Sequence, residues 1–145
     1  KKLPNGKFKK EMKYDKYMSS LPTTDEETIE LYKVLNSFDN EENLAIELKS
    51  QIGKDIEIKE VYTTPFQSFD EDTGESENGV STVLKDTRGV YYATSSKSVY
   101  FSLMNFFDTF GYPNAGKYKS AIFTVTGKKQ RNGIQISLTI KKIIR

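Results

Sequence analysis

The sequence predicts a mainly β protein, α+β by content, with five strands, one helix between the third and fourth strands, and further helices in front. Two runs, residues 55–64 and 133–142, alternate apolar and polar side chains, which is the period of a half-buried strand. Asn132-Gly133 precedes the second run, and Asn-Gly beside alternating apolar residues is a strong hairpin signal. Between the two runs, apolar residues recur at the spacing of one helix face: Val99, Leu103, Phe106, Phe107 and Phe110.

Residues 25–36 are expected to form the first helix. Thr24 is a good N-cap residue, and Glu27 follows it by three positions, which is the spacing of a capping box. A second helical stretch is expected over residues 43–51, because Gly53 is a natural C-terminal stop. The apolar residues of this second stretch also fit the alternation of a strand.

After Gly53 the period changes to two, and the expected strands follow one another. They are residues 55–64, 79–86, 90–95, 117–126 and 133–142. Pro65 is expected to end the first strand, and the acidic, turn-rich residues 66–78 to form a long mobile loop. The helix over residues 96–110 is expected to stop at Gly111, with Pro113 barring its continuation.

The expected organisation is one compact domain of three segments. They are a basic mobile arm over residues 1–20, a helical extension over residues 21–52 and a β-barrel over residues 53–145. Charge is divided along the chain. Residues 1–17 hold seven lysines against two acids, residues 18–80 four lysines against sixteen acids, and residues 81–145 eleven basic residues against two acids. Such asymmetry indicates a polyanion partner, unless the folded surface interleaves the segments.

Histidine and cysteine are both absent from the sequence. Their absence removes the common zinc ligands, the usual general base at neutral pH and the usual nucleophile–base pairs. A catalytic site made of carboxylates alone stays open, but we expect a protein that is not an enzyme and that uses no cofactor or metal. The run Asp70-x-Asp72-x-Gly74 resembles a calcium loop only weakly, since Ser81 stands where such loops have a bidentate glutamate.

The sequence contains no apolar run of the ~18 residues needed to cross a bilayer and no signal-peptide pattern. The lack of cysteine suits a reducing compartment. We therefore expect a cytoplasmic protein with no membrane partner.

The predicted order of three strands, a helix and two strands is similar to the OB-fold. Barrels of that type bind oligonucleotides on the face of strands two and three, beside the loops that join strands one to two and four to five. Here the four–five loop, GKKQRN, is basic, and the one–two loop, FDEDTGESEN, is acidic. One rim of the expected groove therefore suits a nucleic acid and the other does not.

The segment DEDTGE, then VLKDTRGVYYATSSKSVYFSLMNFFDTFG, then a basic hairpin and a final strand, carries a family resemblance. Over residues 53–143 it resembles the small single-stranded DNA-binding proteins of Gram-positive phages and mobile elements. The resemblance implies an OB-type barrel that coats single strands during replication. It implies no catalytic residues.

Two sets of residues are candidates for nucleic-acid contact. The first combines Tyr91 and Tyr92, as stacking platforms, with Lys85 and Arg88 beside them. Alternation sends the two tyrosines to opposite faces, so at most one is a platform; Tyr91 is favoured, and the other belongs to the core. The second set is basic and suits sequence-independent phosphate contact: Lys117, Lys119, Lys128, Lys129 and Arg131.

Other functions remain open at this stage. Lysines at a hairpin tip also serve solubility and protect sheet edges. The acidic middle or the N-terminal helices are also suited to docking a replication partner or a host protein, with weak or absent DNA binding. The sequence does not separate DNA from RNA, because recognition of the 2′-hydroxyl leaves no motif. Oligomeric state and cooperativity are likewise undetermined.

Overall fold

The computed structural model describes residues 14–18, 24–35, 45–113, 117–131 and 133–145. In chain order the elements are β1 (Tyr17–Met18), α1 (Asp25–Leu35), β2 (Ile46–Glu47), the 3₁₀-helix η1 (Leu48–Gln51), β3 (Asp55–Phe69), β4 (Ser76–Asp86), β5 (Tyr91–Thr94), α2 (Lys97–Phe110), β6 (Ser120–Gln130) and β7 (Gly133–Ile144). The mainly β prediction is confirmed.

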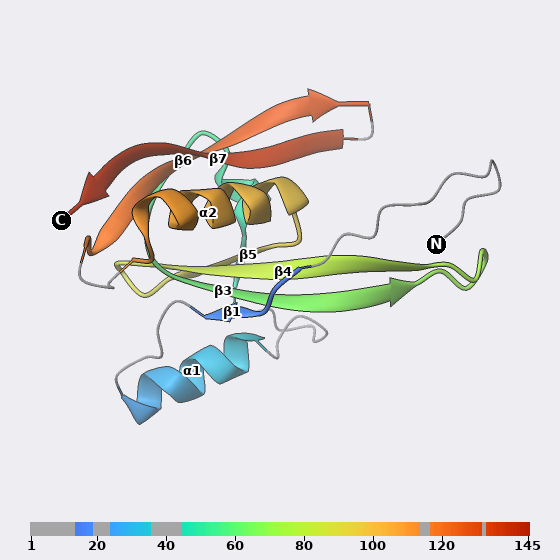
Figure 1. Cartoon of the computed structure of the whole chain (residues 1–145), viewed down its shortest axis with the longest axis horizontal. Coiled ribbons are helices and arrows are strands. Elements are labelled where there is room, and N and C mark those ends of the chain that lie inside the picture. The colour runs from blue at the N-terminus through green and yellow to red at the C-terminus, as the bar shows by residue number, and fades with distance from the viewer. Residues whose placement is uncertain (1–13, 19–23, 36–44, 114–116, 132) are drawn as a thin grey trace.

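The strands form one curled sheet in the order β2-β5-β4-β3-β6-β7, with β1 paired to β3 off this path. β2 runs parallel to β5, and the other pairs are antiparallel. Figure 1 shows α2 between the β6–β7 ribbon and the β3–β4 ribbon, with α1 on the far side of β3 and β4. The five predicted strands are β3 to β7, but the predicted count omits the two-residue strands β1 and β2.

The helix predicted over residues 43–51 is wrong for the part of it that the structure describes. Ile46 pairs with Tyr92, and Glu47 with Ala93, before a single 3₁₀ turn begins at Leu48. Leu48 is fully buried in the core. Alternation is the better guide to this segment, because the strand pairing satisfies its backbone while Leu48 supplies the buried contact.

The first and second strands are longer than predicted. Pro65 does not end β3, because it pairs with Val80 of β4 and the strand continues to Phe69. Within the described residues β3 pairs with β6 only as far as Ile58, so Pro65 lies beyond the region where β3 has a second long partner. Proline is tolerated at such sheet edges. The predicted loop over residues 66–78 is therefore mostly hairpin, and only residues 70–75 form its turn.

Both predicted flanking helices are confirmed. The N–H of Glu27 donates to Oγ1 of Thr24 at 3.2 Å at the start of α1. At the start of α2, the N–H of Val99 donates to Oγ of Ser96 at 3.2 Å. Gly111 ends α2 with φ +84°, a conformation that favours glycine. None of the helices within the described ranges has the length and apolar character required to span a bilayer.

Only residues 14–18 of the predicted mobile arm lie within the described part of the chain, and they pack against the β domain. The ring of Tyr14 meets that of Tyr100 edge-on, with centroids 5.2 Å apart. The N–H of Asp15 donates to the Tyr100 hydroxyl at 2.9 Å, and Tyr17 pairs with Thr63 of β3. This portion is therefore held on the domain.

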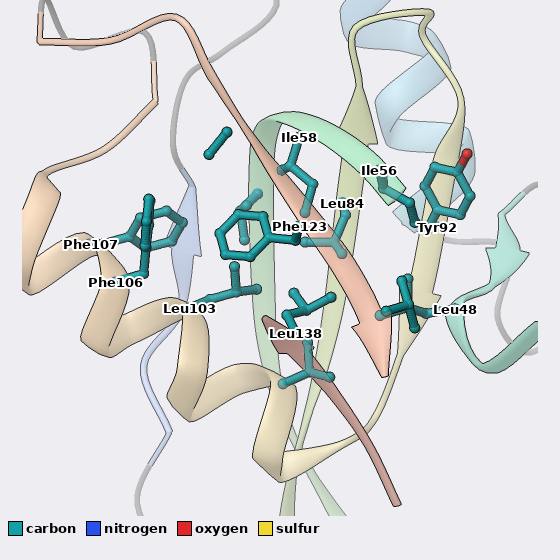
Figure 2. Close-up of a cluster of buried hydrophobic side chains, with 14 of the residues drawn as sticks. Leu48, Ile56, Ile58, Leu84, Tyr92, Leu103, Phe106, Phe107, Phe123 and Leu138 are labelled. Atoms are coloured by element: carbon teal, nitrogen blue, oxygen red, sulfur yellow. The ribbon is translucent and has the colours of Figure 1, made fainter. Parts of the chain in front are cut away.

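Two apolar clusters enclose the middle of the sheet. The larger lies between the sheet and α2, and Figure 2 shows side chains from α2, β6 and β7 gathered in it. The smaller lies on the opposite face, where Leu31 and Val34 of α1 pack on Tyr62, Val83 and Tyr91. The sheet is thus covered on both faces at this level, which determines which side chains remain accessible.

Candidate nucleic-acid interface

The sheet of β3, β4 and β5 has an outer face, defined here as the face that carries Tyr62, Val83 and Tyr91. α1 covers one end of this face. Because side chains alternate along strands, the face continues along the hairpin through the cross-strand pairs Thr64–Ser81 and Phe66–Gly79. Thr64 and Phe66 are exposed. The outer face is therefore closed beneath α1 and open toward the hairpin end.

Tyr91 and Tyr92 do face opposite sides of β5, but neither is an accessible platform. Tyr91 is 4% exposed beneath α1, and Tyr92 is 2% exposed in the main core. The prediction that Tyr91 faces the groove while Tyr92 belongs to the core is therefore wrong for Tyr91 in this conformation. The physical reason is that α1 packs over this face of β5, and the alternation along the strand does not show that a helix covers it.

Lys85 also lies beneath α1. Its Nζ is 3.6 Å from Oε2 of Glu60 and 5.4 Å from the ring centroid of Tyr91. Burial works to lower the pKa of Lys85, but the neighbouring Tyr91 and Glu60 outweigh it and raise that pKa. Lys85 is consequently charged and paired within the fold, so it is not placed to contact phosphate.

Arg88 is exposed at the β4–β5 turn, but its guanidinium is already engaged. Nε and Nη2 donate to Oδ2 of Asp86 at 3.2 and 2.9 Å. Nη2 also donates to the Tyr92 hydroxyl at 3.0 Å, and the Arg88 and Val90 N–H groups donate to Oδ1 of Asp86. Burial works to raise the pKa of Asp86, but these hydrogen bonds outweigh it and lower that pKa. The network stabilises the turn.

A cavity of about 700 Å³ opens on the hairpin side of α1, where β5 ends. It lies between η1, the start of α2 and the start of β7. Its lining is rich in hydroxyl groups and includes two lysines and one glutamate: Glu47, Lys49, Ser81, Thr94, Ser95, Ser96, Lys97 and Ser98, with Gln135 and others. Lys97 donates to Glu77 at 2.9 Å, and this hydrogen bond raises the pKa of Lys97.

The β6–β7 hairpin is confirmed and is basic at its tip. Gln130 pairs with Gly133, while Asn132 lies outside the described residues. Lys128, Lys129 and Arg131 are exposed. Beside the tip is a second cavity, of about 600 Å³, with an apolar floor: Ile52, Gly127 and Ile134, alongside Lys129, Gln130, Arg131 and Gly133.

The two cavities adjoin, because Ile134 lines both. The structure therefore brings the basic tip next to the hydroxyl-lined cavity and the open outer face. Lys117 and Lys119 are exposed but lie elsewhere. The N–H of Lys119 donates to the Ile144 carbonyl, at the end of the ribbon opposite the tip. β6 has 11 residues, and the ten steps between its first and last residues span roughly 33 Å.

Sequence reasoning does not select several residues that line this interface. Lys49 lies in the segment misassigned to a helix, and Lys97 reaches the cavity only because α2 folds back beside β7. Ile134 alternates in phase with Ile136 and Leu138, which are buried, but is itself 48% exposed. Its position directly after Gly133, beyond the end of the core, is the signal that marks it.

The acidic β3–β4 turn uses a carboxylate to close itself. Oδ1 of Asp70 accepts the N–H of Asp72 at 2.9 Å and of Thr73 at 3.4 Å. Gly74 follows at φ +70°. Within the described residues, no group of three or more acidic side chains is arranged to hold a metal ion. The structure thus gives the weak calcium-loop resemblance no support.

The chain is similar to known proteins over most of its length. The family model described as phage single-stranded DNA-binding protein matches residues 12–140. The single-stranded DNA-binding protein of Bacillus phage GA-1 is 38% identical over 138 residues, which is 94% of this chain and 79% of the relative. No solved structure matches the chain significantly. The resemblance drawn from residues 53–143 is confirmed over most of the chain.

Proposed function

The chain belongs to the phage single-stranded DNA-binding protein family, and we propose from this membership that it coats single-stranded DNA during phage replication. It holds the strand by phosphate contacts and base stacking, without strong sequence preference. It acts in the host cytoplasm, needs no cofactor and catalyses no reaction. Proteins that bind single strands in this way combine a basic groove with aromatic platforms.

The observation that carries this proposal is the continuity of the interface. The hydroxyl-lined cavity, the apolar cavity and the basic tip follow one another, with Ile134 shared between the cavities. Hydroxyl groups and the ammonium groups of Lys49 and Lys129 can donate to phosphate oxygens, and an apolar floor can accept the faces of bases. We assign the phosphate contacts at the tip to Lys128, Lys129 and Arg131.

The sheet order supports an OB-type barrel. The path β5-β4-β3-β6-β7 corresponds to strands three, two, one, four and five of the predicted barrel. OB-folds bind oligonucleotides on strands two and three, which are β4 and β5 here. Because α1 covers one end of their outer face, we place the bound strand on the open end of that face and in the cavities.

A competition titration tests the function. Fluorescence anisotropy of a labelled oligo-dT should rise on protein addition, and the affinity should fall steeply as salt is added. Unlabelled single-stranded DNA should compete, whereas duplex DNA of equal length should compete weakly. An RNA oligonucleotide as a third competitor decides between the two nucleic acids. Absence of any anisotropy change at low salt would exclude the proposal.

A second function, docking of a replication or host protein, is favoured by the outward side of α1. Ile29 and Tyr32 are three residues apart and both exposed, beside an acidic first turn. Phage carrying Ile29→Ser together with Tyr32→Ser should replicate poorly if this face docks a partner, although the purified variant binds oligo-dT normally. Normal replication of that phage would rule out a docking function for this face of α1.

A further inference from the structure

Phe66 lies directly opposite Gly79 in the β3–β4 pairing, and its ring occupies the space above that glycine. A Cβ built on Gly79 would lie 2.5 Å from Cζ of Phe66 and 2.7 Å from Cε2. Real side chains do not approach this closely, so the ring depends on a residue without Cβ. An aromatic ring over a cross-strand glycine is a recognised stabilising pair in sheets.

The contact with Gly79 holds one side of the Phe66 ring against the backbone. The side chain nevertheless remains 43% exposed, which is a large fraction for an aromatic side chain. The ring therefore has one side packed on the backbone and an accessible surface elsewhere. When a base stacks on this ring, the protein loses little further conformational freedom, which favours binding.

The surroundings of Phe66 connect it to the proposed interface. Ser81, two residues beyond Gly79 on the same face, lines the cavity of about 700 Å³. Glu77, two residues before Gly79 on this face, is paired with Lys97, so its negative charge is offset close to where a phosphate would pass. Phe66 and Gly79 also line a separate cavity, of about 450 Å³, together with Tyr14 and Pro65.

We propose that Phe66 is a stacking platform for a nucleobase of the bound single strand. This inference rests on the proposed function and adds the residue that supplies the base contact on the open outer face. It assigns to Phe66 the role that buried Tyr91 does not fill in this conformation. The strand then runs from Phe66, past Ser81, through the adjoining cavities to the basic tip.

Phe69 provides a matched comparison on the same hairpin. It is the same residue type, three positions further along β3, and is 66% exposed. It pairs with Ser76, and alternation places it on the face opposite that of Phe66. If any exposed aromatic side chain contributes to DNA binding, substitutions at the two positions should weaken binding equally. A platform on the outer face predicts an effect at Phe66 alone.

The absence of tryptophan from the chain allows a direct test. In the full-length variant Phe66→Trp, the introduced indole is the only tryptophan, and excitation at a wavelength where tyrosine does not absorb reports on it alone. Binding is followed in the same samples by anisotropy of labelled oligo-dT. Stacking should quench the Phe66→Trp emission strongly on oligo-dT and weakly on an abasic oligonucleotide of equal charge. Phe69→Trp should show little quenching with either.

The outcomes separate the inference from the function on which it rests. The platform is overturned if anisotropy rises but the emission of Phe66→Trp is not quenched. It is also overturned if Phe69→Trp is quenched equally. Neither result affects the conclusion that the protein binds DNA. If the anisotropy of labelled oligo-dT does not rise even with the unmodified protein, the proposed function itself is overturned. Quenching confined to Phe66→Trp and to oligonucleotides with bases supports the platform.

A second measurement does not depend on fluorescence. Phe66→Ala should weaken oligo-dT binding roughly 5- to 150-fold, the loss expected for one stacked base. Its affinity for the abasic oligonucleotide should stay within about twofold of the unmodified protein. Phe66→Tyr should keep near-normal affinity, and Phe69→Ala should change neither value. Equal losses on both oligonucleotides for Phe66→Ala would overturn the platform.

Discussion

Lys85 and Glu60 form an ion pair beneath α1, with Nζ 3.6 Å from Oε2 and each side chain 7% exposed. The pair lies directly across β3 and β4, next to Tyr91. A lysine that is buried and paired in this way supports the fold. The candidate interface consequently lies further along the sheet, where α1 no longer covers it.

Lys85→Met should destabilise the fold by roughly 3–5 kcal/mol, because it leaves the Glu60 carboxylate buried without its ion-pair partner. Combining Lys85→Met with Glu60→Leu should recover much of that loss. Urea unfolding of the three proteins measures the free energies. Affinity for oligo-dT should stay unchanged in the folded variants. A large loss of affinity with unchanged stability would instead assign Lys85 to phosphate binding.

Asp86 should make stability depend on pH. Its pKa is lowered in the fold, so its ionised form stabilises the protein fully above the unfolded-state value of about 4. That contribution is lost as the pH falls through the lower folded-state pKa. Asp86→Asn should therefore cost about 1–3 kcal/mol at neutral pH, because it disturbs the network with Arg88 and Tyr92.

The difference in unfolding free energy between Asp86→Asn and the unmodified protein should shrink as the pH is lowered below about 4. Urea unfolding at neutral pH and at two acidic values measures this trend. A difference that stays constant across those values would show that the ionisation of Asp86 is not what stabilises the turn.

The packing of α1 should be separable from the rest of the fold. Only Leu31 and Val34 of this helix are buried, and both contact the outer face. Leu31→Ala with Val34→Ala should expose Tyr91 and raise amide hydrogen exchange in α1, while β3 and β6 remain protected. Uniform loss of protection across the sheet would show instead that α1 unfolds together with the barrel.

Elements whose pattern is local could be predicted from the sequence. The apolar stripe of α2 is contained within fourteen residues, and its capping by Ser96 and termination at Gly111 depend on immediate neighbours. The β6–β7 hairpin is similarly local, since its strands are joined by a two-residue connection. Its basic tip was recognisable for the same reason.

Features that depend on distant pairing could not be predicted in this way. β3 continues through Pro65 because the β3–β4 turn brings β4 alongside it as a pairing partner. Ile46 is extended because it pairs with Tyr92. The burial of Tyr91 depends on α1, whose Leu31 lies sixty residues earlier in the sequence. Alternation shows that two tyrosines face opposite ways, but it does not show what covers each face.

The salt dependence of oligo-dT binding tests the central claim most directly, in a triple variant of the tip: Lys128→Ala, Lys129→Ala and Arg131→Ala. A matched triple variant removes three basic residues from the opposite end of the ribbon: Lys117→Ala, Lys119→Ala and Arg145→Ala. If the tip binds three phosphates, the slope of log affinity against log salt concentration should fall by about 2 in the tip variant and stay unchanged in the control. An unchanged slope in the tip variant, or an equal fall in both, would contradict the placement of the DNA at the β6–β7 hairpin.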